Sequence, residues 1–234
     1  MNRKQKILVT GATGQLGFEL KVLSEGYSQF EWVFSDRTQV SLHNLSVLKN
    51  QLEGICPYII LNCGAYTAVD KAETEPELAN TVNHLAVGIM AQYANDNQAK
   101  LIHISTDYVF DGTSAVALPE EAVTQPINVY GASKREGELA CLAANPDAVI
   151  IRTSWVYSRF GNNFVKTMQR LLQVRDTISV VNDQIGSPTY AADLDLSMMT
   201  IVTAQEWVSG IFNYSNEGEV SWYEFVLAIK EIGG

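Results

Sequence analysis

A glycine-rich turn near the N-terminus is the feature that most restricts the fold. It occupies residues 10–17 (TGATGQLG), after a short apolar run with strand character and at the start of a segment with helical periodicity. In that setting Gly11 allows a tight turn, Gly14 lets the backbone approach a pyrophosphate at the helix N-terminus, and Gly17 lets helix and strand pack closely. A merely structural strand–helix turn is the alternative. The turn predicts a dinucleotide-binding βα unit.

The segments that follow repeat the alternation of strand and helix. We expect strands at residues 7–9, 31–34, 58–62, 100–105 and 148–153, and helices at residues 16–23, 45–52, 76–95 and 126–144. Apolar runs without polar alternation indicate strands that are buried on both faces. Strand–helix alternation indicates a parallel sheet with right-handed crossovers. The predicted fold is therefore a doubly wound parallel α/β sheet.

The alternation of predicted strands and helices is less regular after Ser154. We expect helices at residues 163–174, 192–203 and 221–232, short strands at residues 178–181 and 210–214, and a turn at residues 186–189. Ser221 and Glu224 match a capping box at the start of the last helix. We therefore divide the chain into a dinucleotide-binding domain, residues 1–154, and a small substrate-binding lobe, residues 155–234, which is interleaved with the end of the sheet.

Composition excludes several classes of protein. A formal charge of −10 argues against a non-specific nucleic-acid binder, which needs clustered Lys and Arg. Three widely spaced cysteines indicate a reducing compartment, and no apolar stretch is long enough for a signal peptide or a membrane span. We expect a cytoplasmic protein without nucleic-acid or membrane partners. The scattered His43, His84 and His103 indicate structural roles and no metal site.

An acidic residue ends the second predicted strand. Asp36 lies about 20 residues beyond the turn, where a carboxylate hydrogen-bonds the adenosine ribose in this kind of fold. Arg37 follows directly and could meet a 2′-phosphate instead, or be a solvated loop charge. The pair leaves the choice between NAD and NADP open, so the expected cofactor is NADPH or NADH.

Tyr130 and Lys134 stand four residues apart, on one face of a predicted helix. The Lys134 charge would lower the pKa of the Tyr130 hydroxyl from about 10, which would suit that hydroxyl to acid–base work. The preceding strand ends at Ser105 and Thr106, and strand ends of this kind face the cofactor crevice. Thr106 or Ser105 is therefore placed to offer a hydroxyl to a substrate carbonyl.

These features together resemble the extended short-chain dehydrogenase/reductase family. The resemblance is carried by the turn, Thr106 and the Tyr130–Lys134 pair, and it covers residues from about 6 to about 225. Longer strings narrow it to sugar-nucleotide 4-ketoreductases; they are residues 62–73, 105–112, 128–131, 152–157 and 161–164. The resemblance implies a Rossmann-type sheet with a small C-terminal substrate lobe.

The resemblance also implies a reaction. A nicotinamide hydride would reduce the C4 keto group of dTDP-6-deoxy-L-lyxo-4-hexulose to give dTDP-L-rhamnose. Tyr130 would donate the proton, Lys134 would tune Tyr130 and bind the nicotinamide ribose, and Thr106 would complete the group at the carbonyl. The expected cofactor-binding residues are Gly11, Gly14, Gln15, Leu16, Gly17, Asp36, Arg37, Ala65, Tyr66, Thr67, Tyr130 and Lys134, with Ser41 and Leu42 near the adenine. The expected contacts to the dTDP-sugar are Thr106, Asp107 and Trp155, although Trp155 would alternatively pack at the lobe junction.

The sequence departs from the resemblance at its C-terminus, because members of the family usually continue well past the equivalent of Gly234. We expect the cofactor-binding half of the protein to be intact. Closure of the substrate pocket and a homodimer contact would depend on the further C-terminal segment that other members have. Two alternatives stay open. One is an epimerase or dehydratase of the same fold with tightly held NAD, in which Asp107 would be the acid beside Thr106. The other is a non-catalytic regulatory subunit.

Overall fold

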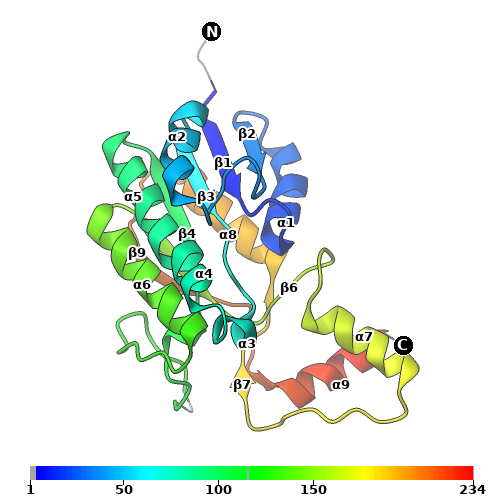
Figure 1. Ribbon diagram of the computed structural model, residues 1–234. Helices are drawn as coiled ribbons and strands as arrows, with labels where there is room; N and C mark the ends of the chain where they lie inside the picture. The colour runs from blue at the N-terminus through cyan, green and yellow to red at the C-terminus, as the bar shows by residue number, and fades with distance from the viewer. Residues whose placement is uncertain (1–3, 115, 234) are drawn as a thin grey trace.

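The computed structural model describes residues 4–114 and 116–233. They form a parallel six-stranded sheet, covered by helices on both faces, with a smaller lobe beyond one end of the strands (Figure 1). The strand order is β2-β1-β3-β4-β5-β9. The strands are β1 (Lys6–Thr10), β2 (Glu31–Ser35), β3 (Ile59–Asn62), β4 (Lys100–Thr106), β5 (Val149–Thr153) and β9 (Gly210–Tyr214). The predicted doubly wound α/β fold is confirmed.

Two helix layers explain why the strands are apolar on both faces. One layer contains α2 (Leu45–Ile55), α5 (Ala86–Asp96) and α6 (Val129–Ala144), and the other contains α1 (Gln15–Leu23) and α8 (Ala191–Thr203). Leu8 and Leu101 point into the core under the first layer, whereas Ile7 and Ile102 point into the core under the second. Successive strand residues therefore both need apolar side chains.

The long helix predicted over residues 76–95 is interrupted. It consists of α4 (Pro76–Asn80), a π-helical turn η2 (Thr81–Leu85) and α5. Three further short helical segments are η1 (Ser24–Gly26), α3 (Val69–Ala72) and η3 (Asp107–Val109). Helix α6 begins three residues later than predicted, because Asn128 is extended and its side chain accepts the N–H of Gly131 at 2.7 Å. An asparagine that caps in this way ends the preceding loop.

The lobe contains the last short strands and two helices. They are β6 (Val156–Tyr157), α7 (Phe164–Val174), β7 (Ile185–Gly186), β8 (Thr189–Tyr190), β10 (Val220–Ser221) and α9 (Trp222–Gly233). The predicted capping box is confirmed, since Ser221 Oγ accepts the Glu224 N–H at 3.1 Å and Glu224 accepts the Ser221 N–H at 2.7 Å. Between these segments, α8 and β9 return to the sheet, so the lobe is not continuous in sequence.

The prediction of a strand at residues 178–181 is wrong. That segment has no ladder, and β7 instead pairs antiparallel with β10. A single backbone bond, from the Tyr223 N–H to the Val181 carbonyl at 3.1 Å, holds the segment against α9. A short apolar run forms a strand only where a partner edge is available. Within the part of the chain that the structure describes, no helix combines the length and apolarity needed to cross a membrane.

Asp195 is a buried carboxyl in α8. Its side chain has no solvent exposure, and among the described residues neither carboxylate oxygen has a hydrogen-bond partner. Burial, and then the charge of Glu19, raises the pKa of Asp195 to about 9. The folded protein therefore binds this proton more tightly than the unfolded chain does. The stabilising contribution is complete below about pH 4 and is lost as the pH rises towards 9.

Replacing Asp195 by asparagine is expected to remove that loss. The free energy of unfolding at pH 8 should rise by about 1–3 kcal/mol, because the wild-type carboxyl is ionised in the unfolded chain and must take up a proton on folding, whereas a neutral amide need not. Urea denaturation of both proteins at pH 5 and pH 8 measures the effect. The gain should be larger at pH 8 than at pH 5. An equal or smaller gain at pH 8 would show that Asp195 does not titrate in this range.

Candidate active site

The predicted glycine turn connects β1 to α1, and two of its glycines cannot be replaced without a clash. Gly11 has a φ of +66°, and a Cβ there would lie 2.7 Å from the Gly64 Cα. A Cβ at Gly17 would lie 2.4 Å from the Ala12 Cα. These contacts support the tight-turn and close-packing roles expected of Gly11 and Gly17.

Gly14 is the N-cap residue of α1. Its backbone is extended, and no side chain caps the helix. The N–H groups of the first helical turn therefore lack a side-chain acceptor, which leaves the positive end of the helix dipole available to an anion. Leu16 packs its side chain into the core. Gln15 points towards the lobe instead, where its Oε1 accepts a hydrogen bond from Asn163 Nδ2 at 2.9 Å.

The end of β2 carries the expected acidic residue. Asp36 Oδ1 accepts the Thr38 N–H at 2.8 Å and the Thr38 hydroxyl at 2.6 Å, and these bonds lower the pKa of Asp36. One carboxylate oxygen of Asp36 thus shapes the loop. Arg37 is exposed beside it. Ser41 and Leu42, expected near the adenine, are buried beneath this loop.

The chain beyond β3 contains Ala65, Tyr66 and Thr67. Asn83, in the π-helical turn, holds this segment: it accepts the Tyr66 N–H at 2.8 Å and donates to the Tyr66 carbonyl at 2.9 Å. The same amide donates to Ser133 Oγ in α6 at 3.0 Å. Asn83 was not predicted as a site residue, because no local pattern distinguishes it from other polar helix residues.

Two further glycines allow α6 to lie close to its neighbours. A Cβ at Gly131 would lie 2.1 Å from the Tyr108 carbonyl oxygen, and a Cβ at Gly137 would lie 2.0 Å from the Asn83 carbonyl oxygen. Their spacing within a helical segment was the signal available in the sequence. The close packing fixes where α6 presents the side chains on this face, including Tyr130 and Lys134.

Tyr130 is nearly buried at the start of α6, and its ring packs edge-to-face on Tyr108 with centroids 5.5 Å apart. Burial raises the pKa of Tyr130 to about 12; the Thr106 hydroxyl opposes this rise and the Asp107 charge adds to it. This direction is opposite to the one that the sequence predicts. The reason is that burial dominates the pKa of Tyr130. Lys134 Nζ donates to the Ile104 carbonyl at 2.6 Å, on the sheet beneath α6.

Thr106 and Asp107 lie at the carboxyl end of β4. The Thr106 hydroxyl donates to Asp107 Oδ1 at 3.0 Å and accepts the Tyr108 N–H at 3.3 Å. Burial raises the pKa of Asp107 to about 6. Ser105, the other candidate hydroxyl, donates to Glu138 at 2.6 Å and so faces α6 instead.

A buried ion pair ties β5 to α6. Arg152 donates through Nε and Nη2 to the two carboxylate oxygens of Glu138, at 2.9 and 2.8 Å, and both side chains are buried. Arg152 Nη1 also donates to the Glu120 carbonyl at 3.0 Å. This pair was not predicted from the sequence. An arginine in an otherwise apolar strand and a glutamate four residues beyond Lys134 were the signals.

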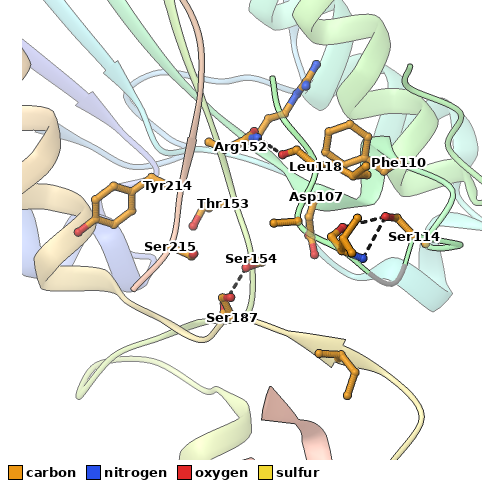
Figure 2. Close-up of a pocket in the computed structure, with 15 residues that line it drawn as sticks. Asp107, Phe110, Ser114, Leu118, Arg152, Thr153, Ser154, Ser187, Tyr214 and Ser215 are labelled. Carbon is orange, nitrogen blue, oxygen red and sulfur yellow. Dashed lines mark hydrogen bonds between the residues drawn. The ribbon is translucent and has the colours of Figure 1, made fainter. Parts of the chain in front are cut away.

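A cavity of about 460 Å³ opens beyond Asp107 (Figure 2). It lies between the carboxyl ends of β4, β5 and β9, with Thr153, Ser154 and Tyr214 in its wall. Trp155 has a φ of +47° and stacks on Trp222 with ring centroids 3.5 Å apart. Trp155 therefore belongs to the aromatic cluster at the lobe junction, which was the alternative role considered for it.

This chain is similar in sequence and architecture to known proteins. Residues 5–232 match the family model described as RmlD substrate binding domain. The dTDP-4-dehydrorhamnose reductase of Sinorhizobium fredii is 44% identical over 232 residues, which are 97% of this chain and 78% of that protein. The enzyme of the same name from Aggregatibacter actinomycetemcomitans is 39% identical over 228 residues, which are 96% of this chain and 78% of that protein. The crystal structure of dTDP-4-dehydrorhamnose reductase from Bacillus anthracis in complex with NADP has a TM-score of 0.93 at 40% identity, and covers 98% of this chain and 81% of that one.

Proposed function

This chain belongs to the RmlD substrate binding domain family, and from that premise we propose that it reduces the C4 keto group of dTDP-6-deoxy-L-lyxo-4-hexulose to give dTDP-L-rhamnose. The observation that carries the proposal is the placement of Tyr130. Its phenol lies beside Thr106 and Asp107, at the carboxyl end of β4 where the cavity opens. Ligands of open α/β sheets bind at this edge.

The glycine turn fits the pyrophosphate of NADPH or NADH. Replacing Gly11 or Gly17 would bring a Cβ against neighbouring backbone, and α1 begins without a side-chain cap. Backbone N–H groups at such a helix start bind phosphate oxygens. Asp36 and Arg37, which follow β2, would meet the adenosine ribose, and Ala65, Tyr66 and Thr67, which follow β3, would also contact the cofactor. The bound nicotinamide would supply the hydride.

Tyr130 is suited to giving a proton rather than taking one. With its pKa raised to about 12, the phenol stays protonated throughout the neutral range. Reduction of a ketone leaves an alkoxide that needs a proton, so a protonated phenol beside the carbonyl is the required general acid. Thr106 donates to Asp107 in the structure and would turn its hydroxyl to the carbonyl oxygen when a substrate displaces that contact.

A coupled assay tests the proposed reaction. The protein is given dTDP-4-keto-6-deoxyglucose, with or without a 3,5-epimerase, and NADPH or NADH oxidation is followed by absorbance. Oxidation that requires the epimerase supports the proposal, and the two rates rank the cofactors. Purified protein that already contains tightly bound NAD, and that causes no net oxidation of added NADPH or NADH, would indicate the epimerase or dehydratase alternative. Cofactor binding without turnover would indicate a regulatory role.

Replacing Gly14 by valine tests the cofactor site separately. The new side chain would fill the approach to the start of α1, where even a Cβ would lie 3.2 Å from the Gly11 carbonyl oxygen. The Kd for NADPH, measured by calorimetry, should rise about tenfold or more because the phosphate contacts are lost. Gly26→Val is the matched control, since a Cβ there meets nothing within 4 Å. Undiminished binding in Gly14→Val would place the dinucleotide elsewhere.

A further inference from the structure

The lobe contacts the helix that follows the glycine turn. Figure 1 shows the loop between β6 and α7 next to the start of α1. Phe160 in this loop stacks on Phe18 of α1, with ring centroids 5.3 Å apart. The Ser158 hydroxyl donates to Glu19 Oε1 at 2.7 Å, and both of these side chains are buried. The lobe therefore packs against the first two turns of α1.

Gln15 and Asn163 form the contact at the very start of α1. Asn163 Nδ2 donates to Gln15 Oε1 at 2.9 Å, and Gln15 Nε2 donates to the Val156 carbonyl at 3.3 Å. Gly161 lies against the same side chain, because a Cβ there would lie 3.3 Å from Gln15 Cγ. Both the amide and the aliphatic stem of Gln15 therefore contact the lobe.

Backbone groups fix the orientation of the two amides. Asn163 is the N-cap of α7, and its Oδ1 accepts the Lys166 N–H at 3.1 Å, so Nδ2 faces away from that helix. Asn163 Nδ2 donates to the Ser158 carbonyl at 2.7 Å as well as to Gln15. Gln15 must then present its oxygen to Asn163, since two NH₂ groups cannot accept from each other. One arrangement of the pair satisfies all of these bonds.

The backbone of Gln15 belongs to the expected cofactor site. Gln15 is the first residue of α1, and Gly14 before it offers no side-chain cap. Under the proposed function, the N–H groups of this first turn bind the phosphates of the dinucleotide. A bound phosphate would thus hold the backbone of the residue whose side chain holds the lobe.

The same segment of the chain begins in the wall of the cavity. Ser154 lines the cavity, and its hydroxyl donates to the carbonyl of Ser187, a lining residue from the lobe, at 2.7 Å (Figure 2). Residues 154–163 therefore connect the cavity wall to the contact on α1. Because the lobe supplies part of this wall, the position of the lobe on the sheet sets the shape of the cavity.

We propose that Gln15 and Asn163 are positioning residues that make the dinucleotide and the dTDP-sugar bind cooperatively. This inference rests on the proposed function. A dinucleotide that orders the first turn of α1 also orders the Gln15 side chain, so the lobe is already in place when the dTDP-sugar binds. The second ligand then binds at a lower entropic cost, and the gain in affinity is the same whichever ligand binds first.

Calorimetry with dTDP tests the inference without turnover. Because dTDP lacks the sugar, the two ligands do not meet at the reacting atoms, and an increase in affinity must pass through the protein. The Kd for dTDP is measured for the full chain with and without saturating NADP⁺. In the wild type, NADP⁺ should lower this Kd about fivefold or more.

Two variants remove the contact from opposite sides. Asn163→Ser removes the amide and keeps a hydroxyl that can cap α7, whereas Gln15→Ala removes the partner and keeps its backbone N–H. In each variant NADP⁺ should lower the Kd for dTDP by less than about twofold. The double variant should lose no more of the coupling than either single variant, because the two residues act through one contact.

Lys166→Met is the matched control. Lys166 Nζ donates to the Gly161 carbonyl at 3.1 Å, in the same loop, and its side chain is exposed. Losing this bond leaves the Gln15–Asn163 contact in place, so NADP⁺ should still lower the Kd for dTDP as it does in the wild type.

The ratio of the two Kd values separates coupling from stability. A merely structural contact would lower the melting temperature of the variants and leave the ratio unchanged. A wild-type Kd for dTDP that NADP⁺ does not lower, or a wild-type ratio in either Asn163→Ser or Gln15→Ala, would overturn the inference. If one variant does not fold, the other variant and the wild type decide. A protein that binds neither ligand contradicts the proposed function as well, whereas binding of both without coupling contradicts this inference alone.

Discussion

Replacing Tyr130 by phenylalanine is expected to lower kcat by about 10²–10⁴-fold, the usual contribution of a general acid. The ring, and with it the edge-to-face contact to Tyr108, stays in place, so only the proton donor is lost. The affinity for NADPH should stay near the wild-type value, because the expected contacts at the glycine turn and the strand ends are untouched and Tyr130 is one of many expected cofactor contacts. Single-turnover oxidation of bound NADPH measures the chemical step, and calorimetry measures the binding.

Tyr108→Phe is the matched control for this variant. Tyr108 is the aromatic neighbour of Tyr130 and is 41% exposed, so losing its hydroxyl should leave kcat near the wild-type value. A Tyr130→Phe protein that turns over at the wild-type rate would contradict the proposed proton donor. A Tyr130→Phe protein with weakened NADPH binding would show that the phenol holds the cofactor as well.

Replacing Glu138 by leucine is expected to lower the free energy of unfolding by about 3–5 kcal/mol. The substitution leaves the buried Arg152 guanidinium without its two charge-assisted hydrogen bonds, and Ser105 loses its acceptor. Urea denaturation with a spectroscopic probe measures the change. The loss should be largely independent of salt, because the pair is shielded from solvent ions.

The double variant Glu138→Leu/Arg152→Met separates the two parts of this cost. Removing both charges takes away the unpaired cation, so most of the stability should return. If the free energy of unfolding falls in the single variant and recovers in the double variant, the unpaired charge of Arg152 is the cause. Equal losses in both variants would instead point to packing of α6 against β5.

Local patterns predicted most of the backbone. The glycine turn, the apolar strands and the Ser221–Glu224 capping box all depend on residues close together in sequence, and the structure has each of them. The strand at residues 178–181 was wrong for the opposite reason. Whether a short apolar run pairs depends on a distant partner, and β10 pairs with residues 185–186 instead.

The candidate site was predicted less completely than the fold. Tyr130, Lys134 and Thr106 were identified by motif, but Asn83, Glu138 and Arg152 were not, because their partners lie on other elements. The domain division, the homodimer and the cytoplasmic location stay predictions. The same holds for the individual roles of the site residues, which the experiments above are designed to test.

The sequence by itself determined which residue types follow which strand, and so placed Gly11, Thr106 and Tyr130 at one edge of a parallel sheet. Only the tertiary structure decided the charge state of that edge. The pKa of Tyr130 depends on burial, and Lys134 meets His103 and Ile104 because α6 packs over β4. Helical spacing puts Tyr130 and Lys134 on one face, but the direction of a lysine side chain and the solvent around a phenol are set by neighbours far away in sequence.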